Sequence, residues 1–279
     1  MIIRSKAKIN LFLKIYGKSS RYHLLHSLVA FCDDIYDELI INKTSNSSHN
    51  LEIMSSEFSS QVPLKHNLLL KVLELCANEK KFFIKLTKNI PVAAGLGGGS
   101  SNAAVLLKYL LETTPIPQNI DLISIVKALG SDVPVCLNQS ASYISSYGQE
   151  VQKTILPTGI WAVLVNPKIE LATADVFRNF NFNENTYIKN YPYFKDQNDF
   201  ITYLKSLDND LEVVAIKILP QITGILSAIA ETKNCLLARM SGSGATCFGL
   251  FNCKNDAIEA KNQLQKDNHN FWIKETLLI

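Results

Sequence analysis

Hydrophobic and polar residues alternate along residues 6–16, near the start of the chain. In a strand, this spacing would place a row of apolar residues on one face and Lys8, Asn10, Phe12 and Lys14 on the other. Alternation or short apolar runs predict further strands at residues 37–42, 51–54, 82–87, 161–165, 236–239, 246–251 and 271–274. Residues 22–33 mix both kinds of position and are left unassigned.

Other stretches repeat their apolar residues at helical spacing. After Ser100 and Ser101, which suit a helix cap, leucines and alanines recur with this period until the pattern stops before Pro115. Further helices are predicted over residues 66–78, 120–129 and 255–266, with two or three more between 200 and 232. Residues 178–198 read as loop, and the order of elements after about residue 155 is compatible with an α+β sandwich.

The densest group of glycines lies between the strand at 82–87 and the helix after Ser101. Gly95, Gly97, Gly98 and Gly99 fall within five positions. A backbone without side chains lets an anion approach closely, and the following helix directs free N–H groups and a positive dipole end toward it. A dinucleotide fingerprint would need glycine at Ser100 or Asn102, and a Walker loop would need a lysine. We therefore expect a phosphate loop of another kind; the alternative is a connection that binds nothing.

Composition indicates an ordinary globular protein. The 279 residues are 47% hydrophobic and 19% charged, and the formal net charge of +3 comes from scattered lysines, which gives no case for nucleic-acid binding. No apolar run approaches the length of a membrane span, and the first residues lack a signal-peptide pattern. The cysteines form no C-x-x-C pair, and buried reduced thiols are expected at Cys76, Cys136, Cys247 and Cys253. These features predict a cytoplasmic protein.

A few polar residues could carry chemistry. Lys8 and Asn10 could reach one ligand from the same strand face, although a solvated lysine beside an amide is common. Asp132, before Val-Pro, could be a general base, although such residues more often serve in turns or caps. His23 and His26 lie three positions apart, but no third ligand is near them in the sequence, so a metal site is not expected there.

Several motifs together resemble the GHMP kinases, small-molecule kinases named for galactose, homoserine, mevalonate and phosphomevalonate. The segment from Pro91 to Ala104 is similar to the central motif of the family. The resemblance extends to the opening Ala-Lys-Ile-Asn at residues 7–10, to Tyr22-His23, to Gly-Ser-Asp-Val-Pro at 130–134 and to the glycine turn at 240–246. It covers the chain from about Lys6 to about Phe251.

The resemblance implies an α+β, two-domain GHMP kinase fold. Residues 1–155 would form an N-terminal ATP-binding domain, ribosomal-S5-like with a left-handed βαβ unit, and residues 156–279 a C-terminal α/β sandwich. It also implies the cofactors ATP and Mg²⁺, with the ion held mostly by phosphate oxygens and water. The expected ATP-binding residues are Asn67, Lys88, Pro91, Ala94, Gly95, Leu96, Gly97, Gly98, Gly99, Ser100 and Ser101.

The triple glycine and the Tyr-His pair are most similar to one branch of the family. That branch phosphorylates the 2-hydroxyl of a cytidine diphosphate-linked methylerythritol, in the non-mevalonate route to isoprenoid precursors. Asp132 would be the general base and Lys8 would activate the acceptor hydroxyl. The expected substrate-binding residues are Asn10, Tyr22, His23, Thr173, Phe177, Gly242 and Ser243. Ser20-Arg21 stand where Asp-Gly is usual, which bears on cytidine binding more than on phosphoryl transfer.

Two other functions remain open at this point. One is a GHMP kinase acting on homoserine or a mevalonate derivative, against which the Tyr-His and triple-glycine motifs argue. The other is a non-catalytic nucleotide-binding relative, against which the presence of both Lys8 and Asp132 argues. The expected assembly is a monomer or weak homodimer that binds neither nucleic acid nor membrane.

Overall fold

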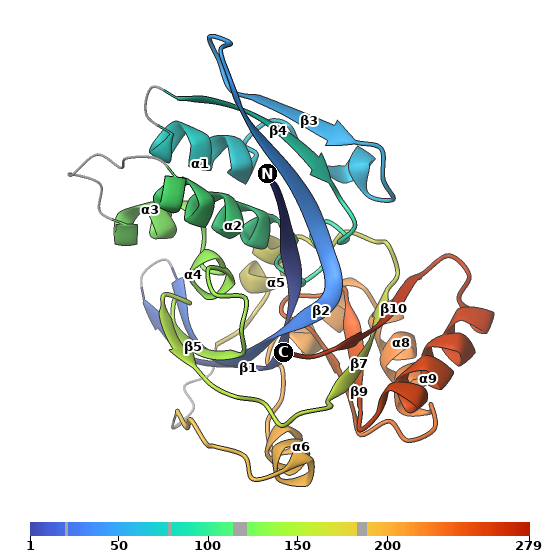
Figure 1. Ribbon diagram of the computed structural model, residues 1–279. Coiled ribbons are helices and arrows are strands. Elements are labelled where there is room, and N and C mark those ends of the chain that lie inside the picture. Colours follow the sequence, from blue (N-terminus) through green and yellow to red (C-terminus); the bar gives the residue numbers. More distant parts are fainter. Residues whose placement is uncertain (20–21, 78–79, 114–121, 183–188) are drawn as a thin grey trace.

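A long antiparallel hairpin of two strands forms the frame of the molecule (Figure 1). It consists of β1 (Ile2–Ser19) and β2 (Tyr22–Thr44). The computed structural model describes residues 1–279 apart from 20–21, 78–79, 114–121 and 183–188, so Ser20 and Arg21 lie outside the described residues. The unassigned stretch 22–33 is part of β2.

The N-terminal sheet grows from this hairpin in the order β3-β4-β2-β5-β6, with β1 also paired to β2. The added strands are β3 (Asn50–Met54), β4 (Lys81–Thr87), β5 (Ser142–Ser146) and β6 (Glu150–Lys153). β3 and β4 are parallel, and the other pairs are antiparallel. The alternate residues Phe82, Ile84 and Leu86 of β4 are buried, because they face a layer of helices.

That helical layer covers one face of the sheet (Figure 1). Its members are α1 (Leu68–Cys76), α2 (Gly98–Thr113), α3 (Leu122–Leu129) and α4 (Val133–Cys136). A short 3₁₀ helix, η1 (Ser59–Gln61), follows β3 in the chain. α2 begins at Gly98, so Ser100 and Ser101 lie in its first turn rather than capping it, contrary to the sequence expectation. The described part of the chain contains no helix long and apolar enough to cross a membrane.

The C-terminal half is built on a second, antiparallel sheet in the order β10-β7-β9-β8. Its strands are β7 (Trp161–Asn166), β8 (Leu237–Met240), β9 (Cys247–Phe251) and β10 (Trp272–Leu277). Its helices are α5 (Thr173–Arg178), α6 (Gln197–Lys205), α7 (Glu212–Ile218), α8 (Gln221–Ala230) and α9 (Lys254–Asp267). The predicted strands and helices of this half are confirmed, whereas α5 was not predicted; in the first sheet, the hairpin of β5 and β6 was not predicted either.

The two halves meet along β1 and β2. Leu13 forms a parallel bridge with Asn209, and Phe31 exchanges backbone hydrogen bonds with Ile279 at 3.0 and 2.9 Å. One buried apolar cluster combines Ile9 and Leu11 of β1 with side chains of the C-terminal half such as Phe248. β1 therefore belongs to the interior of the whole molecule.

The register of β1 against β2 shifts on both sides of Lys8 and Asn10. The first shift falls between Lys6 and Lys8, where the extra residues lie on β2, and the second falls between Asn10 and Phe12, where Leu11 is the extra residue of β1. The Lys8 N–H donates to the Leu96 carbonyl at 3.0 Å, and the Leu11 carbonyl accepts from Arg239 Nη1 at 2.7 Å. Such bulges redirect the side chains beside them, and here those are the two polar residues of the strand.

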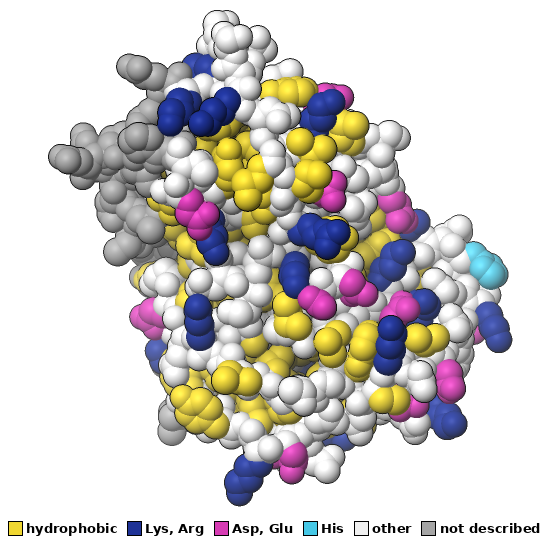
Figure 2. All heavy atoms as spheres, viewed as in Figure 1, with side chains coloured by type: hydrophobic (Ala, Val, Ile, Leu, Met, Phe, Trp, Pro, Cys, Tyr) yellow, Lys and Arg dark blue, Asp and Glu magenta, His cyan; other side chains and the backbone are white. Residues whose placement is uncertain are grey.

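Surface chemistry agrees in part with the expectations from composition. On the face seen in Figure 2, acidic and basic side chains are interspersed and do not gather by sign. Cys76, Cys136 and Cys247 are buried and free, but Cys253 is exposed, which corrects the expectation for that residue. Cys253 lies just before α9 at a helix end, where an apolar neighbourhood in sequence does not ensure burial.

We expect Arg239→Met to lower the free energy of unfolding by about 3 kcal/mol or more, because buried carbonyl groups lose their donors. The guanidinium donates to the carbonyls of Leu11, Leu204 and Leu207, and the residue is only 5% exposed. Urea unfolding measures the change. The control Arg178→Met removes an exposed pair with Asp175 and should cost under about 0.5 kcal/mol; equal losses would contradict the bracing role of Arg239.

Candidate active site

A cavity of about 370 Å³ lies where the two halves meet. Its walls come from segments far apart in sequence: β1, the stretch around α1, the glycine loop, the start of α4, the start of α5 and the second glycine turn. The predicted residues that line it are Lys8, Asn10, Asn67, Lys88, Pro91, Ala94, Gly95, Gly97, Gly98, Gly99, Ser100, Asp132, Thr173, Phe177, Gly242 and Ser243.

The glycine loop contains residues with positive φ, a backbone conformation that residues other than glycine rarely adopt. Ala93, Gly95 and Gly97 have φ of 49°, 75° and 63°. A Cβ on Gly95 would lie 2.1 Å from the Ser241 carbonyl oxygen, and one on Gly97 would lie 2.8 Å from the Lys8 side chain. The loop leads into the 16-residue helix α2, whose N-terminal N–H groups and dipole favour an anion at the cavity wall.

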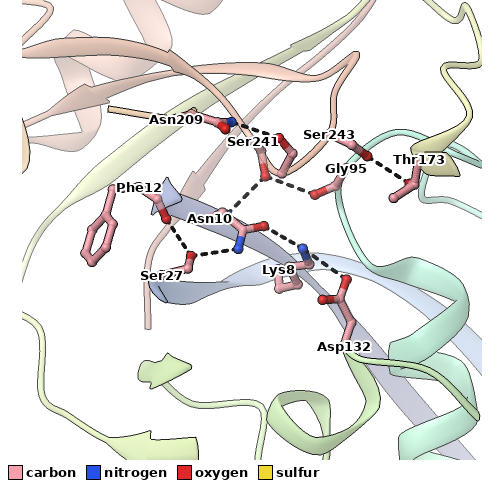
Figure 3. Close-up of polar contacts among 11 residues, drawn as sticks. Lys8, Asn10, Phe12, Ser27, Gly95, Asp132, Thr173, Asn209, Ser241 and Ser243 are labelled. Carbon is pink, nitrogen blue, oxygen red and sulfur yellow. Dashed lines mark hydrogen bonds and ion pairs between the residues drawn. The ribbon is translucent and has the colours of Figure 1, made fainter. Parts of the chain in front are cut away.

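The ammonium of Lys8 is held by two oxygen atoms. Lys8 Nζ donates to Asn10 Oδ1 at 2.6 Å and lies 3.1 Å from Asp132 Oδ2 (Figure 3). Lys8 is 3% exposed, whereas the Asp132 side chain is about one-third exposed. Asp132 occupies the N-cap position of α4 but makes no capping hydrogen bond through its side chain, so its carboxylate is directed at the lysine.

Asn10 is fixed on its remaining sides as well. Its backbone N–H donates to Ser241 Oγ at 3.1 Å, and Ser241 Oγ donates to the Gly95 carbonyl at 3.0 Å. Its side-chain Nδ2 donates to Ser27 Oγ at 2.8 Å (Figure 3). The second glycine turn therefore braces both the strand that carries Lys8 and the glycine loop.

Lys88 lies at the opposite end of the loop, with its ammonium paired to the carboxylate of Asp37. Both side chains are buried, and Asp37 Oδ1 also accepts the backbone N–H groups of Asn89 and Ile90 at 2.8 and 2.9 Å. Sequence analysis missed Asp37. Asp37 stands next to Glu38 in a stretch of β2 that holds other acidic residues, so no local signal set it apart.

An aromatic group lies near Thr173 and Phe177. The His23 ring stacks on Phe177 with centroids 5.4 Å apart and 29° between planes, and Phe180 meets it edge-on at 5.7 Å. Burial, with the nearby charge of Lys18, lowers the pKa of His23, which favours the neutral imidazole. Thr173 Oγ1 and Ser243 Oγ are 2.8 Å apart and join α5 to the second glycine turn.

Some predicted residues do not reach the cavity. The Leu96 side chain lies in the apolar core, and only its carbonyl serves the site, through the Lys8 N–H. Ser101 is fully buried in α2, and His23 lies behind Phe177. Tyr22 lies on β2, but its side chain is outside the described part of the structure.

Comparison with known proteins identifies the family. The GHMP kinases N terminal domain matches residues 67–142, and the GHMP kinases C terminal model matches residues 192–270. The 4-diphosphocytidyl-2-C-methyl-D-erythritol kinase of Roseobacter denitrificans is 36% identical over 98% of this chain and 91% of its own length. That of Paramagnetospirillum magneticum is 38% identical over 99% of this chain and 98% of its own length. The chain belongs to this family of GHMP kinases.

Solved structures agree with the assignment. A crystal structure of 4-(cytidine 5'-diphospho)-2C-methyl-D-erythritol kinase is 26% identical, with a TM-score of 0.75 over 100% of this chain and 99% of that one. Homoserine kinase from Cytophaga hutchinsonii has a TM-score of 0.63 at 16% identity over 100% of this chain and 94% of its own, and shows the fold alone. The expected α+β GHMP kinase fold is confirmed, and as a member of this kinase family the protein uses ATP.

In this GHMP kinase, we expect Gly97→Ala to lower activity at least tenfold, because a misplaced reacting group can cost that much. The new methyl group would press on the Lys8 side chain at a position whose φ is +63°. ADP release measures the rate, and urea unfolding measures stability. Gly224→Ala is the matched control, since open space surrounds its Cβ; equal effects of the two changes would contradict the close fit of Gly97 against Lys8.

Proposed function

We propose that the protein transfers the γ-phosphoryl group of ATP to the 2-hydroxyl of 4-diphosphocytidyl-2-C-methyl-D-erythritol, a step of the non-mevalonate isoprenoid pathway. The observation that carries the proposal is the placement of Lys8 Nζ between Asn10 Oδ1 at 2.6 Å and Asp132 Oδ2 at 3.1 Å, on the wall of the cavity that the glycine loop also lines. The full-length relatives that bear this kinase name support the choice of acceptor.

Backbone groups would bind the phosphates of ATP. N–H groups at the start of α2 and the bare glycines 97–99 suit the triphosphate, and the α1 end of the cavity, with Asn67, suits the nucleoside. The Mg²⁺ that accompanies ATP would be held mostly by phosphate oxygens and water, because Lys8 already engages the Asp132 carboxylate. Bound there, the ion would neutralise charge on the transferred group.

Side chains would activate the hydroxyl group that accepts the phosphoryl group. Asp132 takes the proton of the attacking hydroxyl, and its partly exposed carboxylate faces the cavity where that hydroxyl would lie. Lys8 stabilises the developing charge on the oxygen, and Asn10 directs the ammonium. Positioning and electrostatics of this kind supply most of the catalysis in phosphoryl transfer.

The cytidine side of the acceptor is assigned to Tyr22, His23, Thr173, Phe177, Gly242 and Ser243. A ring face and a neutral imidazole, which can both donate and accept, suit a pyrimidine. The His23 ring lies behind Phe177, so we propose that the base reaches the imidazole by displacing or flanking that phenyl ring.

We also propose a domain boundary near residue 155, between β6 of the first sheet and β7 of the second. On this division residues 1–155 bind ATP, and residues 156–279 contribute the outer wall. A cytoplasmic location and a monomer or weak homodimer stay predictions.

Asp132→Ala should lower kcat by about three orders of magnitude, because the general base is lost. ADP release with ATP and 4-diphosphocytidyl-2-C-methyl-D-erythritol measures it, and Asp256→Ala, which changes an exposed carboxylate of α9, is the control. A comparable rate in Asp132→Ala would remove the residue from the role of base.

Homoserine and mevalonate belong in the same assay. Turnover of either one without turnover of the cytidyl compound would overturn the proposed acceptor. Binding of ATP without turnover of any acceptor would instead indicate a non-catalytic relative.

A further inference from the structure

Ser27 lies on β2 directly behind the catalytic strand and carries a buried hydroxyl. It accepts from Asn10 Nδ2 at 2.8 Å and donates to the backbone carbonyl of Phe12 (Figure 3). We propose that Ser27 is a positioning residue that sets the orientation of the Asn10 amide and, through it, the direction of the Lys8 ammonium. The inference rests on the proposed function for the role of Lys8.

The direction of these hydrogen bonds follows from what each group can do. A backbone carbonyl only accepts, so the Ser27 proton goes to Phe12. The Ser27 oxygen then faces Asn10 with a lone pair and selects the NH₂ end of the amide. The opposite end of that amide, Oδ1, is left for the ammonium of Lys8, which only donates.

The strand geometry makes this arrangement possible. The register of β1 shifts between Asn10 and Phe12, and Ser27 pairs across the hairpin with Leu13. Because of this shift, the side chain of Asn10 and the backbone carbonyl of Phe12, both on β1, contact the same Ser27 hydroxyl. The Asn10 backbone is held separately by Ser241, so loss of the Ser27 hydroxyl would free the amide without releasing the strand.

Without that hydroxyl the amide would keep its contact with the Lys8 ammonium, but its NH₂ group would lose the Ser27 acceptor. Asn10 is 2% exposed, so an unpaired NH₂ group cannot turn to water at low cost. A tilt of the amide toward another acceptor for its NH₂ group would draw Oδ1 away from the Lys8 ammonium and leave Asp132 as the other oxygen partner described here. The ammonium would then shift toward the carboxylate and away from the acceptor oxygen.

The first test compares Ser27→Ala with Ser27→Thr, which keeps the hydroxyl. We expect kcat of Ser27→Ala to fall by about ten- to hundredfold, since an unsatisfied buried group costs on the order of 1–3 kcal/mol, while the KM for ATP stays unchanged. Ser27→Thr should restore most of the rate. Ser142→Ala, which removes another fully buried strand serine that donates to Ser140, should leave kcat unchanged.

A double-mutant cycle separates positioning from general loss of structure. In an Asn10→Ala background, Ser27→Ala should lower single-turnover rates no further, because its effect passes through the amide. Additive losses, or equal losses in Ser27→Ala and Ser142→Ala, would overturn the proposal.

A measurement without substrate distinguishes failure of this inference from failure of the proposed function. The side-chain NH₂ resonances of Asn10 in the free protein should shift in Ser27→Ala and stay in place in Ser142→Ala. Unchanged Asn10 resonances in Ser27→Ala would overturn the role of Ser27, whichever acceptor the enzyme phosphorylates. If the Asn10 resonances shift in Ser27→Ala while the wild-type protein fails to turn over the cytidyl compound, only the acceptor assignment is overturned.

Discussion

A buried ammonium is the constraint on which the rest of the site depends. Lys8 is 3% exposed, and a cation removed from water must be surrounded by acceptors or lose its charge. Asn10 and Asp132 supply those acceptors at 2.6 and 3.1 Å. Gly97 completes the enclosure, because only a residue without Cβ fits beside the lysine stem. The short distances around the Lys8 ammonium and the lack of side chains in the loop beside it thus both follow from burying this cation.

Hydrogen bonds also fix β1, which carries Lys8 and Asn10, to the C-terminal half. Asn209 donates from Nδ2 to the carbonyls of Met240 and Gly242, each at 2.8 Å, and so shapes the second glycine turn. Asp210 binds the Lys14 ammonium and accepts the Ile15 N–H at 2.7 Å. Asn209 and Asp210 thus join the second glycine turn to β1, the strand that carries Lys8.

The sequence was informative wherever one local rule decided the outcome. Strict alternation placed Lys8 and Asn10 on one side of a strand, and the cluster of glycines at 95 and 97–99 marked the loop that lines the cavity. It left residues 22–33 of β2 unassigned because Leu28 to Cys32 are all buried, so this part of the strand has no polar face to produce alternation.

Long-range partners were the other gap. Asp37 meets Lys88 across 51 residues, and Asn10 meets Ser241 across 231. The spacing of hydrophobic residues within one strand or helix carries no information about pairs so far apart in the sequence. Phe177 lines the cavity as expected, but the sequence gave no sign that its ring would stack on His23.

The contact between the two glycine segments limits how this protein can vary. The Gly95 carbonyl receives the Ser241 hydroxyl across 146 residues of sequence, and the Ser241 carbonyl fills the space where a Cβ at position 95 would stand. A side chain at position 95 would require the turn to retreat, and the turn also holds the Asn10 backbone. During evolution, a substitution in the glycine loop at position 95 would therefore require a compensating change in the second glycine turn, so the two segments must change together.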